Sequence, residues 1–355
     1  MDKQKYISWF KDIRKEDVSL VGGKGANLGE LKSINIPVPD GFIVTTETYK
    51  KFIEETGVKK ELKKIITDIS NNIYTFDQTR QASEMLKKII REAEMPQGIQ
   101  KPIIKAYQML CLEENPISVA VRSSASEEDM KSASFAGQYE TLLNVKNEET
   151  LISAIKKCWS SIFSDCVIKY KESKGIKDDN EMSMYIGVVV QCMVNAETAG
   201  VMFTLDPRTG DRSKIIVEAN WGLGESLVSG TVTPDYYSIS KNPIRLIEVK
   251  VGEKRVFTAF SNEGVVEKET PIAQRKKSCL KEEEVISLAY LGERIEKHYK
   301  IPQDIEWAME KKKDNSLGLY ILQTRCETVW SQKKEPKDNK KPVSKIAAQF
   351  KGFKF

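Results

Sequence analysis

The first third of the chain carries apolar residues mainly at helical spacing. Residues 25–34 follow this spacing, and a turn containing two prolines separates them from the apolar run of residues 42–44. This order predicts a helix, a turn and a short strand. Thr46 is suited to cap a further helix over residues 47–56. We expect helical segments with breaks as far as Leu112.

A buried strand and a polar loop come next. Residues 118–122 predict a strand, and the small and polar residues from Ser123 to Gly137 predict a loop. Because loops that follow strands often hold ligands, this one is a candidate contact. Residues 148–174 place apolar side chains on one helical face, and Gly175 is expected to end that helix.

The composition shifts after Met184 toward β-branched residues, which predicts a second, sheet-rich part of the chain. The clearest strand candidates are residues 187–190, 200–204, 215–217 and 244–251. A helix is expected over residues 281–299, and two last strands over residues 304–310 and 319–324. We therefore expect an N-terminal lobe over residues 1–186, a C-terminal lobe over 187–330, and a lysine-rich tail or linker over 331–355.

Charge and hydropathy narrow the function classes. The formal net charge is +5, but residues 331–355 hold eight lysines against two acidic residues, so the body before them carries −1. A nucleic-acid-binding domain normally concentrates basic residues on one folded face, so we expect no nucleic-acid partner. No stretch approaches about 20 consecutive apolar residues, and the first residues lack the apolar core of a signal peptide. We expect a cytoplasmic protein with no membrane partner.

Histidine and cysteine usage argues against two common kinds of site. The chain has one histidine, His298, and six scattered cysteines without a Cys-x-x-Cys pair. Zinc sites and Ser-His-Asp triads need clustered residues of these types. We expect reduced cysteines and a structural role for His298.

A glycine-rich stretch surrounds Lys24. Residues 21–29 place this lysine among glycines that let backbone amides approach an anion, directly before a helix. Phosphate is the natural ligand of such a stretch, although the pattern matches neither a Walker loop nor a dinucleotide fingerprint. A tight turn with a solvated lysine is the alternative.

A second candidate begins at Arg122, where the predicted strand enters the polar loop. The planar guanidinium suits phosphate oxygens, and Gly137 permits a close backbone approach. A capped surface loop is the alternative, and for the acidic residues 127–129 we favour it. For Arg122, which emerges from a buried strand, we expect a ligand contact.

Alternate residues on the two last predicted strands form a third candidate. Asp304 and Glu306 share one face of their strand, as do Gln323 and Arg325 of theirs. Side by side, the two strands would gather a carboxylate and an amide oxygen, which suits magnesium next to a triphosphate. Arg325 could neutralise charge on a transferred group. A cross-strand salt bridge on the sheet surface is the alternative.

Taken in order, these blocks resemble the N-terminal nucleotide-binding region of the phosphoenolpyruvate synthase and pyruvate phosphate dikinase family, which includes rifampicin phosphotransferase. The resemblance spans residues 18–330 and rests on five blocks in family order: VGGKGANLGEL, VRSSASEED, SFAGQYETLLNV, GLGESLVSGTVTPD, and DIEW followed by LQTR. It implies an ATP-grasp fold of the α+β or α/β class, with two lobes closing on ATP. It also disfavours the surface salt bridge as the role of the last two strands.

The resemblance implies roles for residues of the N-terminal lobe and its edge. Lys24 and Arg122 match residues that contact the phosphates of ATP. Gly137 and Thr141 match the loop over those phosphates. Gln191 matches the hinge strand beside the adenine.

It also implies roles on the last two strands. Glu306 and Gln323 look like the pair that holds Mg²⁺, Arg325 like the arginine at the transferred phosphate, and Asp304 like its supporting acid. Cys326 stands where the family commonly has proline. The residues expected to be catalytic are Arg325, Lys24, Arg122 and Asp304.

The family passes phosphate from ATP to a histidine on a separate swivelling domain, and neither that acceptor segment nor the C-terminal substrate barrel occurs in this chain. We therefore expect an incomplete, dikinase-type phosphotransferase that moves the β-phosphate of ATP to a histidine of a partner chain, giving AMP and phosphate. The partner then phosphorylates a small molecule. Phenol is favoured, because phenylphosphate synthase in this family divides its machinery between chains in a similar way.

Two alternatives stay open at this point. One is an excised ATP-binding domain of a phosphoenolpyruvate synthase or rifampicin phosphotransferase. The other is a nucleotide-sensing module without catalysis, which the retained Glu306, Gln323 and Arg325 argue against.

Overall fold

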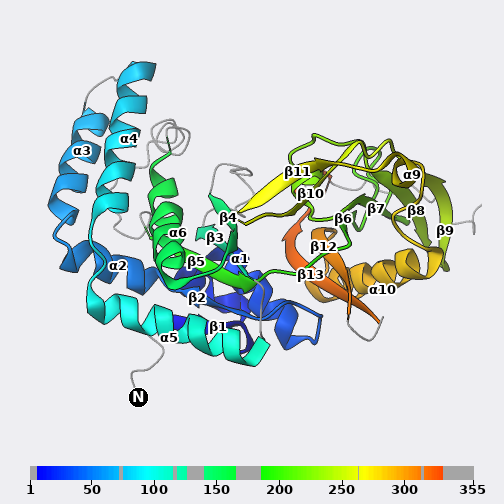
Figure 1. Ribbon diagram of the computed structural model, residues 1–355, viewed down its shortest axis with the longest axis horizontal. Coiled ribbons are helices and arrows are strands. Elements are labelled where there is room, and N and C mark those ends of the chain that lie inside the picture. The colour runs from blue at the N-terminus through cyan, green and yellow to red at the C-terminus, as the bar shows by residue number, and fades with distance from the viewer. Residues whose placement is uncertain are drawn as a thin grey trace, which may run out of the picture.

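Two antiparallel sheets, each with its helices, and a separate two-stranded hairpin form the described part of the chain (Figure 1). The computed structural model describes residues 6–71, 75–114, 118–125, 140–164, 185–262, 264–312 and 316–330. Within these ranges, neighbouring strands of both sheets pair antiparallel. Of the two expected fold classes, α+β is therefore the right one.

The N-terminal sheet has the strand order β1-β2-β5-β3-β4. Its strands are β1 (Ile7–Trp9), β2 (Gly41–Val44), β3 (Val119–Ala125), β4 (Thr141–Val145) and β5 (Ile186–Cys192). The sequence expectation placed all but the first residue of β5 in the C-terminal lobe. That assignment is wrong for this strand, because its backbone pairs with β2 on one side and β3 on the other. A fully buried strand looks the same in sequence whichever sheet it joins.

Helices cover one face of this sheet and bury a shared core. Phe52 and Trp159 pack there with ring centroids 4.9 Å apart, and both side chains are inaccessible to solvent. The sequence expectation of several broken helices before residue 114 is confirmed. The helices of that region are α2 (Thr46–Glu55), α3 (Lys59–Asn71), α4 (Phe76–Glu92) and α5 (Gln97–Glu114). A further helix of the same core, α6 (Glu148–Ser160), follows β4.

Two element ends differ from the sequence expectation. The cap of α2 is Thr45, whose side chain accepts from the Thr48 amide, whereas the Thr46 hydroxyl donates to the Ser19 carbonyl. The helix expected to run to residue 174 ends at Ser160 and continues as a 3₁₀ turn over residues 161–163. Residues 165–184 lie outside the described ranges.

The C-terminal sheet has the strand order β13-β12-β6-β7-β8-β9. One face packs against α10 (Glu282–Tyr299), where Gly292 allows close approach to Met202, and Trp307 lies fully buried in the core. Residues of α1 (Val18–Ser33) join this same core. The strands are β6 (Thr198–Phe203), β7 (Lys214–Trp221), β8 (Asp235–Lys241), β9 (Ile244–Lys250), β12 (Gln303–Lys311) and β13 (Leu317–Cys326).

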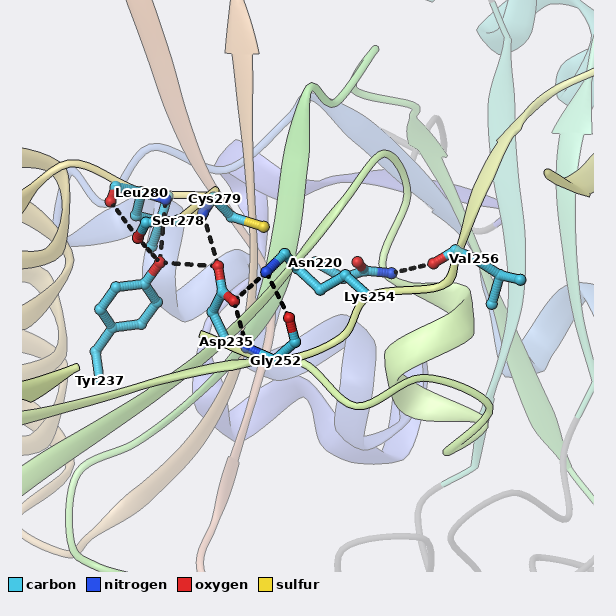
Figure 2. A network of polar contacts seen from close by, with 9 residues as sticks. All are labelled: Asn220, Asp235, Tyr237, Gly252, Lys254, Val256, Ser278, Cys279 and Leu280. Atoms are coloured by element: carbon cyan, nitrogen blue, oxygen red, sulfur yellow. Dashed lines mark hydrogen bonds and ion pairs between the residues drawn. The ribbon is translucent and has the colours of Figure 1, made fainter. Parts of the chain in front are cut away.

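A two-stranded hairpin, β10 (Val256–Phe260) and β11 (Val265–Glu269), stands apart from both sheets. Its base is tied to the C-terminal sheet by the network in Figure 2, at whose centre the buried Asp235 carboxylate pairs with the buried Lys254 ammonium. Asp235 also accepts from the backbone amides of Gly252 (2.8 Å) and Cys279 (2.7 Å). The short helix α9 (Ile272–Arg275) follows the hairpin along the chain, and another short helix, α8 (Glu225–Val228), lies between β7 and β8.

The tip of the hairpin contacts the N-terminal sheet. The side-chain Nδ2 of Asn144 on β4 donates to the Ser261 carbonyl at 2.9 Å, and the Lys146 ammonium donates to the same carbonyl at 3.1 Å. The hairpin therefore connects the two sheets, a feature that the sequence expectation did not contain. None of the helices in the described ranges is long and apolar enough to cross a membrane.

Candidate functional site

The glycine-rich stretch forms a break inside α1. Gly22 has φ 73° and ψ 172°, so the helix restarts after it and Lys24 lies in the first turn of the new segment. A Cβ at Gly22 would come within 1.9 Å of the Ser124 carbonyl oxygen. Glycine is therefore required here, both for the backbone angle and for contact with β3. The glycine-rich stretch thus stands at the start of a helical segment, as expected, and a short helical turn precedes the break.

Ser124 holds both sides of this break. Its hydroxyl donates to the Val21 carbonyl at 2.8 Å and accepts from the Gly25 amide at 3.0 Å. One of the amides exposed by the helix restart is thus already paired within the protein. Ser124 was expected in the loop, but it is a buried residue of β3, which is longer than the predicted strand.

Arg122 connects the two sheets. Its Nη2 lies 3.2 Å from Oε2 of Glu306 on β12, and its Nη1 donates to the Leu322 carbonyl on β13 at 3.4 Å. Thr141, the first residue of β4, is the backbone partner of Arg122 in the N-terminal sheet. Arg122 and Glu306, two candidate residues 184 positions apart in sequence, are thereby brought into contact.

The last two strands lie side by side, as their sequence pattern predicted. Glu306 is the cross-strand partner of Gln323, and Asp304 that of Arg325. Arg325 Nε donates to Asp304 Oδ2 at 2.8 Å. Burial raises the pKa of Asp304, and the Arg325 guanidinium opposes this rise. The arginine side chain is 45% exposed, so part of it still faces solvent.

Gln191 lies at the centre of the N-terminal sheet, on β5. Its side chain is 2% exposed, and its Nε2 has no hydrogen-bond partner among the described residues. A buried donor without an acceptor is costly. Gly137, the remaining candidate of the phosphate loop, lies outside the described ranges.

The single histidine lies at the end of α10, shortly before β12 in sequence, and makes a contact between helices. His298, near the end of α10, lies with its Nε2 2.6 Å from Oε1 of Glu30 on α1. This contact joins two helices, in agreement with the expected structural role.

Few protein groups are available for a metal ion. Within the described ranges there is no group of three or more histidine, cysteine or acidic residues that could hold one. Glu306 and Gln323 offer oxygen donors on adjacent strands. Such a sparse set fits Mg²⁺, which takes few protein ligands and completes its shell with phosphate oxygens and water.

Sequence reasoning missed two residues that shape the site. Ser124 clamps the kink of α1, and the Asn27 side chain donates to the Thr324 carbonyl, between Gln323 and Arg325, at 3.2 Å. Both stand inside the motif blocks of the family resemblance. Their presence there was a signal, but neither carries a charge that suggests a ligand.

The family comparison assigns the chain to the ATP-binding domains of the dikinase type. The sequence profile of the pyruvate phosphate dikinase AMP/ATP-binding domain matches residues 18–345, and the chain belongs to this family.

Full-length relatives extend far beyond the matched region. The chain is 41% identical over 333 residues to a probable phosphoenolpyruvate synthase of Methanothermobacter thermautotrophicus, covering 93% of this chain and 47% of the relative. It is 42% identical over 334 residues to one of Archaeoglobus fulgidus (94% and 43%), and 38% identical over 355 residues to one of Methanocaldococcus jannaschii (99% and 29%). The chain thus spans less than half the length of these relatives.

Proposed function

We propose that this chain binds ATP between its two sheets, in an ATP-grasp arrangement, and transfers the β-phosphate to a histidine on a separate chain. The observation that carries the proposal is the meeting of Arg122, Glu306, Gln323 and Arg325, which come from three strands of two sheets. All four residues lie in the sequence blocks that resemble this family of ATP-binding domains, within the region that the family profile matches.

The cationic residues act on the phosphates. Lys24, in the first turn after the α1 kink, and Arg122, at the sheet junction, neutralise and orient the triphosphate. Thr141 lies beside Arg122 and adds a hydroxyl donor. Gln191 supplies its unpaired amide to the adenine. Arg325, held by Asp304, stabilises the charge that develops on the transferred group.

Glu306 and Gln323 are the residues that would hold Mg²⁺. The carboxylate has two oxygens, of which Arg122 contacts one, so arginine and metal can share it. When bound, the metal supplies charge neutralisation to the phosphate oxygens. The chain's own contribution is to fix these two oxygen donors on neighbouring strands.

The proposed reaction balances with water as a co-reactant. ATP, the partner's histidine and water give phosphohistidine, AMP and phosphate. The histidine nitrogen forms a bond to the β-phosphorus, and the bridging oxygen between α and β leaves with AMP. Water cleaves the bond between β and γ. The protons released pass to solvent.

The partner chain is the remaining requirement. Relatives about twice as long or longer contain further sequence beyond the matched region, consistent with acceptor and substrate parts that lie elsewhere. Phenol as final acceptor, as in phenylphosphate synthase, is our favoured proposal. An excised domain of a phosphoenolpyruvate synthase is the alternative.

Transfer can be followed with ATP carrying radioactive phosphate in either the β or the γ position. The chain is incubated with Mg²⁺, each labelled ATP and soluble proteins of the native host. We expect β-label on a second protein in an acid-labile, alkali-stable linkage, γ-label in free phosphate, and AMP in equal amount. Adding phenol or pyruvate to the labelled protein then shows which acceptor removes the label.

A matched pair of variants on β13 supplies the control. Arg325→Ala should lower labelling at least about 100-fold, because one charge-stabilising group is lost. Cys326→Ser, at the next and exposed position, should label like the wild type. If ATP binds but neither labelled protein nor AMP appears, catalysis is refuted and a nucleotide-sensing module remains.

A further inference from the structure

The outer edge of β13 is held by the N-terminal part of the chain. β13 is the terminal strand of its sheet, so one row of its backbone groups has no neighbouring strand. The Ile321 amide donates to the Pro37 carbonyl at 2.8 Å, and the Leu322 carbonyl accepts from Arg122 at 3.4 Å. The Thr324 carbonyl accepts from Asn27 Nδ2 at 3.2 Å. These contacts fix the position of β13 against the glycine-rich helix.

Asn27 lies between candidate residues of α1 and candidate residues of β13 and contacts both elements. It lies three residues after Lys24 on α1, so both side chains occupy neighbouring places on one helix surface. The carbonyl that it binds belongs to Thr324, which separates Gln323 from Arg325 along β13.

Both ends of the Asn27 amide are engaged. While Nδ2 contacts β13, Oδ1 accepts from the Tyr299 hydroxyl at 3.4 Å, at the end of α10. The side chain thus has a fixed orientation between α1, α10 and β13. A short amide with two contacts gives little freedom for α1 to slide along the strand.

We propose that Asn27 is a positioning residue that sets the spacing between Lys24 on α1 and Gln323 and Arg325 on β13. The inference rests on the proposed function, in which these groups contact one triphosphate from two sides. Small displacements of binding groups lower affinity and rate strongly, because the groups no longer reach the same phosphates together. AMP lacks the β- and γ-phosphates and is insensitive to this spacing.

The test compares ATP with AMP by isothermal titration in the presence of Mg²⁺. For Asn27→Ala we expect ATP affinity to fall about tenfold, the effect of losing one well-placed hydrogen-bond group. AMP affinity should change less than about twofold. Asn27→Asp keeps the acceptor for Tyr299 but loses the donor to Thr324, so it should behave like Asn27→Ala.

His298→Ala is the matched control. It removes another contact between α1 and α10, the one with Glu30, but leaves the Asn27–Thr324 hydrogen bond in place. ATP affinity should stay near that of the wild type. Thermal unfolding of each variant checks that the affinities are measured on folded protein.

The outcomes separate the two levels of the proposal. If the wild type prefers ATP to AMP and Asn27→Ala keeps that preference, the positioning role is overturned while the proposed function stands. Equal losses for ATP and AMP also overturn it, since they indicate general damage. If the wild type shows no preference for ATP, the proposed function fails and the inference falls with it.

Discussion

The buried pair at the base of the hairpin offers a strong test of the structure. Asp235 and Lys254 both have side chains that are 0% exposed, and Asp235 also accepts two backbone hydrogen bonds at 2.7 and 2.8 Å. The Tyr237 hydroxyl lies 3.3 Å from its Oδ2. Replacing Asp235 by alanine would strand a buried ammonium and leave two amides without acceptors (Figure 2).

The expected loss follows from these contacts. Stranding one partner of a buried ion pair costs about 3–5 kcal/mol, and an unpaired buried donor costs about 1–3 kcal/mol. Since such terms overlap, we expect Asp235→Ala to lower the free energy of unfolding by at least about 4 kcal/mol. Lys254→Met should cost less, because the carboxylate keeps its two backbone donors. The double variant should cost less than Asp235→Ala alone, since no charge is stranded.

Urea unfolding followed by circular dichroism measures these differences, and hydrogen exchange locates them. Amides of β10 should lose protection first in Asp235→Ala. Glu253→Ala is the control, because Glu253 forms an exposed ion pair with Arg255 and should change stability by less than about 0.5 kcal/mol. A cost for Asp235→Ala below about 1 kcal/mol, or below that of Lys254→Met, would refute the reasoning.

Gly22, Cys158 and Glu218 each allow a direct test. Gly22→Ala should destabilise by more than about 3 kcal/mol, whereas Gly57→Ala, with a similar φ but open space, should cost about 1 kcal/mol by urea unfolding. Burial raises the pKa of Cys158 to about 12, so iodoacetamide at neutral pH should label exposed Cys326 and spare Cys158, as read by mass spectrometry. Desolvation raises the folded pKa of Glu218, a contribution that costs stability as pH rises through that value. The free energy of unfolding of Glu218→Gln should therefore rise relative to that of the wild type between about pH 4 and pH 7. A difference between the two proteins that stays constant over this range would contradict the prediction.

The sequence predicted the last two strands, and their pairing brings together the residues that were expected to meet. The candidate residues stand two apart on each strand, Asp304 and Glu306 on one and Gln323 and Arg325 on the other. Side chains two apart share a face of a strand, so antiparallel pairing in the observed register brings all four to the same face. Arg122 was also recognisable, since a charged residue within a buried strand needs a partner. Its partner, Glu306, lies 184 positions away and could not be read from local pattern.

Other features needed the three-dimensional structure. The strand β5 is apolar on both faces, so its composition does not reveal which sheet it joins. The hairpin strand β11 is largely exposed and polar, which hides it from hydrophobic pattern. The kink at Gly22 depends on contact with Ser124, a residue of a different strand. Local spacing predicted elements, while long-range contacts decided their ends and neighbours.

The packing of α1 has a consequence for how this chain folds during synthesis. Leu28 and Leu31 belong to the same core as Leu288 and Trp307, which are made near the end of the described chain. Translation proceeds from the N-terminus, so α1 leaves the ribosome long before its final neighbours exist. The α1 helix is thus synthesised well before the elements that complete its native packing. Until β12 and α10 have been synthesised, the apolar surface of α1 is either exposed to solvent or covered by other groups.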